Sequence, residues 1–540
     1  MKGGFFLTEK KDSFLKGAFI LAAAGLVVKV LGAVYRIPLA RLIKDEGMGL
    51  YQMAYPIYLI LLSISTAGIP TAISKMVSED VAIGRFKNAH RIFKVSMIVL
   101  TIIGLGLTVL LGFGANWLAV KIYKNPKAFY SILSISPAIF FVSIMSCFRG
   151  FFQGLQDMTP SAVSQIVEQI GRVIAVFILA YMLLPYGVEY AAAGAAFGPV
   201  AGSVMGLIVL IAIYYRRKRT FDAQILLDES GSLENPLHII NRLFIFAVPV
   251  TLGGLISPMM SMADAAIVSS RLQDAGFSVK RAAELFGQLS GMAVPLINLP
   301  VVITVALSAT LVPAISEAVV LKNRQMVAER SETGMRMSII FGLPSAVGMY
   351  VLATPITLLL YNNAEAGMSL QILAWGVVFL ALTQTTTGIL QGVGYAGVPV
   401  RNMVFGALIK IFINYFLTAM PSINIKGAAL GTVIGYLVPS ILNCFMVIKL
   451  TDAVFDLKHM LLKPALASGI MGITAYVSHT GFMALGLSQN KATLVAIVLG
   501  AAIYGLALIA VGGIKKSDLE FLPGNQRIIA FFNKFGLLRG

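Results

Sequence analysis

The chain has 540 residues, of which 58% are hydrophobic and 12% charged, and its mean hydropathy is +0.85. Soluble domains carry about 25% charged residues, so this composition excludes a soluble protein and indicates an integral membrane protein. A net charge of +18 would suggest nucleic-acid binding in a soluble chain. Cytoplasmic loops of membrane proteins concentrate Lys and Arg, which explains the charge without a nucleic-acid partner.

Apolar stretches long enough to cross a bilayer recur along the whole chain. A helical span needs about 20 mainly apolar residues. We predict six spans in the first half, at 15–39, 50–73, 92–115, 129–153, 160–184 and 191–215. Six more follow at 241–268, 285–313, 335–358, 369–392, 399–420 and 427–450, and the last two at 461–482 and 491–513. The sequence therefore predicts an all-α polytopic membrane protein with fourteen spans.

The segments outside the spans are too short for a soluble domain. Residues 1–14 and 514–540 mix Phe and Ile with Lys and Arg, which predicts basic amphipathic helices on the inner leaflet, in contact with membrane lipids. Residues 216–240 begin with the run RRKR and join two halves. We therefore divide the remainder into an N-lobe (15–215), a C-lobe (241–450) and two further helices (451–513).

Lys and Arg are distributed unevenly over the two sides of the membrane. With a cytoplasmic N-terminus, the basic segments near 75–94, 216–219, 322–336 and 449–463 all fall inside, as do both ends of the chain. We count Arg149, near the inner end of the fourth span, with these cytoplasmic cations. The positive-inside rule then places both termini in the cytoplasm. The cations left within spans are Lys29, Arg36, Arg172 and Lys410.

The two halves of the chain resemble each other. Gly194 begins GAAFGPVAG and Gly427 begins GAALGTVIG, and two further short matches follow the same order at similar offsets. One match of this kind would be uninformative, because tight helix packing uses small residues everywhere. An even number of spans separates equivalent positions, so the halves are parallel repeats. We predict two parallel six-helix lobes in the manner of alternating-access transporters, with the last two helices outside the repeat.

Two cations stand in the first span, Lys29 and Arg36. A cation near the bilayer centre costs about 2.5–3.5 kcal/mol and persists where it faces protein or water. The two residues are seven positions apart, which places them on one face of a helix. We interpret them as lining a cavity; the alternative is that their side chains extend to the membrane surface.

Other charges occupy equivalent spans of the two lobes. Glu168 and Arg172 lie four residues apart in the fifth span, a spacing that suits an ion pair, and both a structural and a cavity role remain open. Asp264 lies in the seventh span, and Lys410 with Asn414 in the eleventh, the repeat partners of the first and fifth. If Asp264 pairs with Lys410, the second lobe is neutral. The first lobe keeps an excess of positive charge that suits an anionic substrate group.

Signatures of enzyme chemistry are lacking. The four histidines are scattered, and no HExxH, GxSxG or P-loop motif is present. The two cysteines, Cys147 and Cys444, lie far apart in apolar segments and indicate neither a disulfide framework nor a metal site. We expect no enzymatic activity, no cofactor and no firm metal site.

The first helices carry the residues of a family resemblance: KVLGAVYRIPLARLI is followed by EGMGLYQMAYPIY and GIPTAISKMVSE. With the fourteen spans and the two lobes, they resemble the multidrug/oligosaccharidyl-lipid/polysaccharide (MOP) exporter superfamily, whose fold is MATE-like. Within it the chain is most similar to MurJ-type lipid II flippases, in the branch of the stage V sporulation protein B relatives. The resemblance implies transport of the undecaprenyl-pyrophosphate-linked peptidoglycan precursor across the cytoplasmic membrane of a bacterium.

The resemblance also implies roles for individual residues. Essential arginines of the family grip the pyrophosphate, and Lys29 and Arg36 fall at or within one residue of two of them. An arginine of the family's second helix has no counterpart here, so its role moves to Arg172, with Glu168 beside it. The two extra helices would form a groove for the lipid tail.

A coupling site is a second implication of the resemblance. Some relatives bind sodium through the seventh, eleventh and twelfth helices, where Asp264, Asn414 and Thr432 match. Lys410 stands at a further ligand position, so a built-in ammonium replaces the ion there, and we expect a charge pair or coupling site without firm sodium. Membrane potential or a proton or sodium gradient remains open as the driving force.

We predict a lipid II flippase that acts as a monomer in cell-wall synthesis, works by alternating access and serves the cell-wall machinery. Three alternatives remain. The cargo is another lipid-linked oligosaccharide, such as a teichoic or exopolysaccharide precursor; the protein is a cation-coupled multidrug exporter, for which acidic cavity residues are expected; or it is a scaffold without transport.

Overall fold

The computed structural model describes residues 21, 23–25, 27–28, 30–32, 34–66, 68–226, 228, 233–453 and 456–513. Within these residues the chain is almost entirely helical and forms no strand, which confirms the all-α fold. The amphipathic segments predicted at 1–14 and 514–540 lie outside the described residues, and so does Lys29.

In the described part of the chain, eleven helices are long and apolar enough to cross a membrane, or twelve when the bent pair Arg324–Val351 and Ala353–Tyr361 counts as one span. The 60-residue stretch Ala23–Ala82 is one of them, and it includes the second predicted span and the first from residue 23 onward. Non-helical backbone at Lys44 (φ 56°, ψ −170°) interrupts it. The polytopic membrane fold is thus confirmed, and the number fourteen stays a prediction consistent with these spans.

The chain divides into two compact units. The first comprises Met1–Ser270 with Ser278–Gly287, and the second comprises Arg271–Phe277 with Gln288–Gly540. The predicted seventh span, assigned to the C-lobe by the repeat, packs mostly with the first unit. The helices of the first unit are α2 (Arg36–Thr66), α3 (Ile69–Ala82), α4 (Phe86–Trp117), α5 (Ala128–Ile135), α6 (Pro137–Gly154), α7 (Thr159–Leu183), α8 (Val188–Ala196), α9 (Gly198–Arg216), α10 (Lys218–Leu226), most of α11 (Pro236–Asp274) and α12 (Val279–Phe286).

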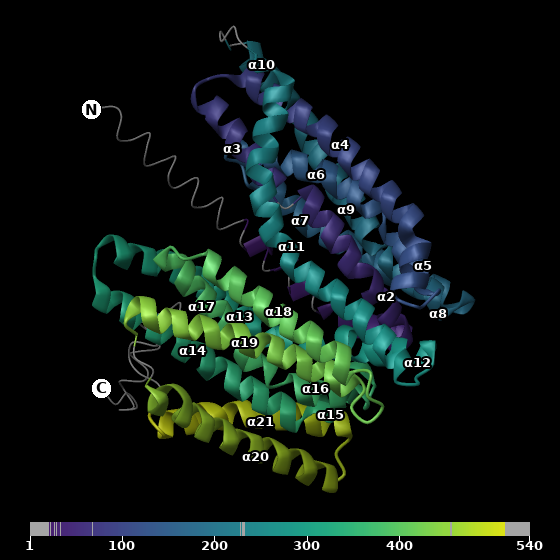
Figure 1. The fold of residues 1–540 in the computed structure, drawn as a ribbon, viewed down its shortest axis with the longest axis vertical. Coiled ribbons are helices and arrows are strands. Elements are labelled where there is room, and N and C mark those ends of the chain that lie inside the picture. Colours follow the sequence, from purple (N-terminus) through teal and green to yellow (C-terminus); the bar gives the residue numbers. More distant parts are fainter. Residues whose placement is uncertain are drawn as a thin grey trace. The chain divides into compact units, whose positions relative to one another are not determined.

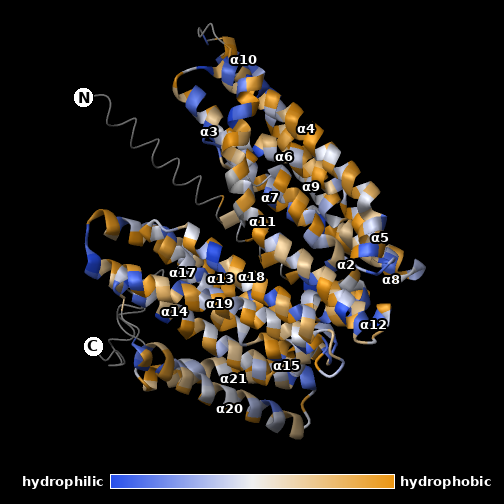
Figure 2. Ribbon diagram, in the orientation of Figure 1, coloured by the Kyte–Doolittle hydropathy of each residue, from blue (hydrophilic) through white to orange (hydrophobic). Residues whose placement is uncertain are grey.

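The second unit contains most of the eighth predicted span and ends with the two helices that lie outside the repeat. Its helices are α13 (Val294–Val320), α14 (Arg324–Val351), α15 (Ala353–Tyr361), α16 (Ala366–Leu373), α17 (Gly376–Val393), α18 (Gly397–Leu417), α19 (Ile425–Thr451), α20 (Lys463–Ala484) and α21 (Gln489–Ala510). The last two lie side by side and pack on α14 through Met337, Ile340, Ala467 and Leu508 (Figure 1). Hydrophobic residues cover the helices, and hydrophilic residues gather near their ends (Figure 2).

Helix α6 is fixed by a face of glycine and phenylalanine. A Cβ at Gly150 would lie 2.8 Å from the carbonyl oxygen of Pro70, so only glycine permits α3 to come this close. Phe151 is fully buried, and its ring centroid lies 4.6 Å from that of Phe93 on α4. Because this face packs on α3 and α4, Arg149 on another face of α6 is directed toward α7.

The repeated glycine motif brings helices together at their charged residues. A Cβ at Gly202 on α9 would lie 2.5 Å from the carbonyl oxygen of Glu168 and 3.0 Å from the Cβ of Arg172, both on α7. In the second unit a Cβ at Gly435 on α19 would lie 3.0 Å from the Cβ of Lys410 on α18. In both units the third glycine of the motif therefore faces a cation on a neighbouring helix, Arg172 on α7 or Lys410 on α18.

Candidate functional site

Glu168 lies between two arginines inside the first unit. Its Oε1 accepts a hydrogen bond from Nη2 of Arg172, one turn along α7, at 2.9 Å, and its Oε2 accepts one from Nη2 of Arg149 on α6, also at 2.9 Å. Nε of Arg149 donates to Oγ of Ser164 at 3.0 Å. The three charged side chains are only 13–15% exposed. One carboxylate thus holds two guanidinium groups in a partly buried site.

Arg36 joins this group through a row of tyrosines on α2. Its Cζ lies 5.8 Å from the ring centroid of Tyr55, within the range of a cation–π interaction. The hydroxyls of Tyr35 and Tyr51 lie 3.1 Å apart, and the rings of Tyr51 and Tyr55 stack at 5.7 Å. The spacing of residues 51, 55 and 58 places three tyrosines on one helical face.

The same tyrosine face reaches the arginines on α6 and α7. Tyr55 and Tyr58 lie near Arg172, and Tyr58 also lies near Glu168 and Arg149. We refer to Arg36, Arg149, Arg172, Glu168 and the tyrosines at 35, 51, 55 and 58 as the arginine–tyrosine cluster.

The arginine–tyrosine cluster carries an excess of positive charge, since its three arginines face one glutamate. Within the described part of the chain, the buried Nε atoms of Arg36 and Arg172 have no hydrogen-bond partner. A buried donor left unpaired is costly, so such atoms favour an acceptor that arrives from outside. Guanidinium groups bind phosphate and carboxylate in a fork-like geometry, and tyrosine hydroxyls add further donors. The cluster is suited to an anionic group.

The structure brings together three of the predicted cavity residues, Arg36, Arg172 and Glu168, and adds Arg149. Arg149, which the sequence analysis counts among the cytoplasmic cations, lies within α6, which continues to Gly154, and its side chain bonds Glu168. Arg149 could have been found from the fourth span, whose apolar run includes it. The fourth predicted residue, Lys29, lies outside the described residues.

The predicted coupling residues lie in both units. Lys410 and Asn414 are buried on α18, and Thr432 is buried on α19, where its hydroxyl donates to the carbonyl of Ala428 at 3.0 Å. Asp264 lies on α11 in the first unit. A pair of Asp264 with Lys410 would join the two units, and it stays a prediction. Among the described residues no group of three or more His, Cys, Asp or Glu is placed to hold a metal ion.

Exposed ion pairs lie apart from the cluster, between the spans. Nζ of Lys127 lies 3.3 Å from Oε1 of Glu46 and 3.2 Å from Oε2 of Glu189. Partial burial lowers the pKa of Lys127, but its hydrogen bonds with Glu189 and Glu46 outweigh this effect and hold the pKa above its ordinary value. The Lys127 side chain is 48% exposed, so these pairs are surface interactions of small energy.

An apolar cavity of about 480 Å³ opens beside the last two helices. Its lining comes from α14, α15, α20 and α21 and includes Phe341, Pro344, Met471, Ala496 and Tyr504. The hydroxyl of Tyr504 is satisfied by the carbonyl of Ile340 at 2.6 Å, so the walls offer little free polar surface. This composition suits a hydrocarbon chain.

Comparison with known proteins places the chain in a family. The profile of the family described as "Polysaccharide biosynthesis protein" matches residues 14–319, and that of MatE matches residues 288–416. Stage V sporulation protein B of Bacillus subtilis is 32% identical over 96% of this chain and 99% of its own length. Lipid II flippase MurJ of Bacillus subtilis is 28% identical over 97% of this chain and 99% of its own length.

A solved structure shows the same fold. Lipid II flippase MurJ in an inward closed conformation matches with a TM-score of 0.67 and 16% identity, over 91% of this chain and 98% of that one. These comparisons are consistent with the membrane-spanning helices of the structure, because the similar proteins match along nearly the full chain and share the fold. The chain is therefore a membrane protein of the polysaccharide biosynthesis protein family, and it shares the fold of the MurJ structure.

Proposed function

We propose that this protein is a flippase that moves lipid II, the undecaprenyl-pyrophosphate-linked peptidoglycan precursor, across the cytoplasmic membrane. The observation that carries the proposal is the arginine–tyrosine cluster, which places three arginines against one glutamate within membrane-spanning helices. A pyrophosphate carries the negative charge and the acceptor oxygens that this excess requires.

The apolar cavity beside α20 and α21 supports a lipid cargo. A polyprenyl chain needs apolar walls while its headgroup needs cationic donors, and the chain offers both kinds of surface. A drug-like cation would favour acidic residues instead, and the cluster has the opposite charge. The relative named lipid II flippase MurJ, 28% identical over nearly the whole chain, supports the same cargo.

In the proposed mechanism Glu168 balances two arginines while the site is empty. An arriving pyrophosphate competes with Glu168 for Arg149 and Arg172 and supplies acceptors for the Nε atoms of Arg36 and Arg172. The lobes then rock to expose the site on the other side, as in transporters built from parallel repeats, with both termini in the cytoplasm. We assign the protein no catalysis; it acts as a monomer, and the cell-wall synthesis machinery receives the cargo.

The decisive experiment is depletion of the protein in its bacterium, followed by measurement of lipid II on the inner leaflet. Depletion should cause lipid II to accumulate there. Re-expression of the wild type should reverse the accumulation, whereas Arg36→Ala and Arg172→Ala variants at equal abundance should not. Arg401→Ala, which removes an exposed arginine of α18, is the matched control and should restore transport. Accumulation of a different lipid-linked precursor, with lipid II unchanged, would contradict the proposed cargo.

A further inference from the structure

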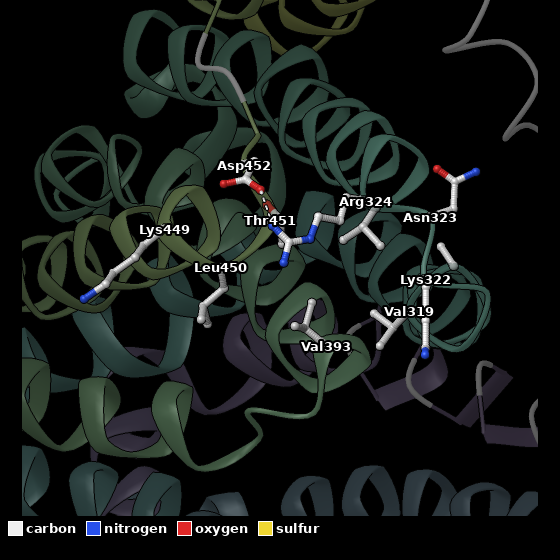
Figure 3. Close-up of a pocket in the computed structure, with 11 residues that line it drawn as sticks. Val319, Lys322, Asn323, Arg324, Val393, Lys449, Leu450, Thr451 and Asp452 are labelled. Atoms are coloured by element: carbon white, nitrogen blue, oxygen red, sulfur yellow. Dashed lines mark ion pairs between the residues drawn. The ribbon is translucent and has the colours of Figure 1, made fainter.

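A second positively charged site lies in the second unit, at the ends of its membrane-spanning helices. A cavity of about 510 Å³ opens where α13, α17 and α19 end and α14 begins. The cations Lys322, Arg324 and Lys449 line it together with Asp452 (Figure 3). Nothing in the proposed transport mechanism uses these residues.

The cavity keeps a positive excess. Nη1 of Arg324 lies 3.9 Å from Oδ2 of Asp452, and the two side chains are 91% and 71% exposed, so this ion pair is weak and well solvated. Lys322 and Lys449 are exposed and come from different helix ends, and Figure 3 shows them on opposite sides of the opening. The cations that line the cavity thus come from the ends of α13 and α19 and from the start of α14.

The same cavity also has apolar lining residues. Val319, Val327, Val393 and Leu450 line it beside the charged groups. Cations next to apolar side chains, at the ends of membrane-spanning helices, suit a phospholipid at the membrane surface, whose acyl chains begin next to the phosphate. A free phosphate would gain no binding energy from these apolar residues. A lipid is held in the membrane by its chains, and this raises its local concentration at the cavity.

We propose that this cavity binds the phosphodiester headgroup of an anionic membrane phospholipid, such as phosphatidylglycerol, in the inner leaflet. The three cations hold the phosphate, and the valines and Leu450 contact the glycerol and the first methylenes. Asp452 opposes the anion and limits the affinity. This site is separate in residues and in cargo from the arginine–tyrosine cluster.

The test compares lipid binding by the full-length protein in detergent, measured by native mass spectrometry with phosphatidylglycerol or phosphatidylcholine added. The wild type should retain phosphatidylglycerol in preference to phosphatidylcholine. The triple variant Lys322→Gln, Arg324→Gln and Lys449→Gln should lose at least about tenfold of this preference, since each cation near an anionic lipid contributes about 1 kcal/mol.

The matched control also removes three positive charges on the predicted cytoplasmic side, but from residues outside the cavity. Arg216→Gln, Lys218→Gln and Arg219→Gln alter exposed cations that do not line the cavity, and this triple variant should keep the wild-type preference. Equal preference in the two triple variants would overturn the proposal.

Two further measurements distinguish specific lipid binding from misfolding of the variant and from binding of a different ligand. Asp452→Asn removes the opposing charge and should strengthen phosphatidylglycerol binding; no change or a loss would contradict the assignment of Asp452. Inorganic phosphate at millimolar concentration should leave the lipid bound. Displacement by phosphate would show that the cavity takes a free anion and would refute the lipid assignment.

Discussion

Glu168 is the residue whose replacement tests the arginine–tyrosine cluster most directly. Glu168→Gln keeps the shape of the side chain but removes the charge that balances Arg149 and Arg172. Both hydrogen bonds are 2.9 Å long, and the three side chains are 13–15% exposed, so solvent compensates little. Removing one partner of a buried ion pair costs about 3–5 kcal/mol. Because this site is partly exposed, we expect the free energy of unfolding to fall by about 3 kcal/mol.

Thermal unfolding of the purified protein in detergent measures this loss. Glu189→Gln is the matched control, because its partner Lys127 is 48% exposed and the pair should contribute less than about 1 kcal/mol. Added inorganic pyrophosphate should stabilise Glu168→Gln more than the wild type, because the anion no longer competes with a carboxylate. Equal stabilisation of both proteins, or a Glu168→Gln variant as stable as the wild type, would refute the view that Glu168 occupies the place of the anion.

Three further predictions concern neighbouring residues. Arg149→Lys keeps the charge but loses the guanidinium geometry that donates to Glu168 and Ser164 at the same time. Lipid II should therefore accumulate on the inner leaflet although the protein is made in normal amounts. Gly202→Ala should lower the free energy of unfolding by about 1–3 kcal/mol, because its Cβ meets the backbone of α7; Gly106→Ala, with open space around it, should not, and thermal unfolding distinguishes them. Tyr55→Phe should keep the ring contact with Arg36 and preserve transport better than Tyr55→Ala in the same lipid II assay.

Much of the fold follows from hydropathy, because the bilayer forces apolar helices of a minimum length. The spacing of Glu168 and Arg172 on one helix also predicted their ion pair, which the structure confirms at 2.9 Å. Contacts within one helix depend only on its periodicity, so they can be inferred before the tertiary structure is known.

Contacts between helices were harder to infer. Arg149 lies near the end of its span, where a cation that reaches the membrane surface costs little, and only the packing of α6 on α3 and α4 shows that it turns inward. The 80° bend between α14 and α15 went unpredicted. The chain stays apolar enough there for the continuous span predicted at 335–358, and tertiary packing decides where it bends. The break at Lys44, by contrast, falls in the charged connection expected between the first two spans.

The glycine contacts at Gly202 and Gly435 also bear on the origin of the chain. In each half, two helices pack closely at the third glycine of the motif. The cation that this glycine faces differs between the halves, Arg172 in one and Lys410 in the other. An even number of spans lets two copies of an ancestral half insert in the same orientation and pair with one another. Duplication of such a half, followed by divergence that includes this position, would create an asymmetric transporter from a symmetric dimer.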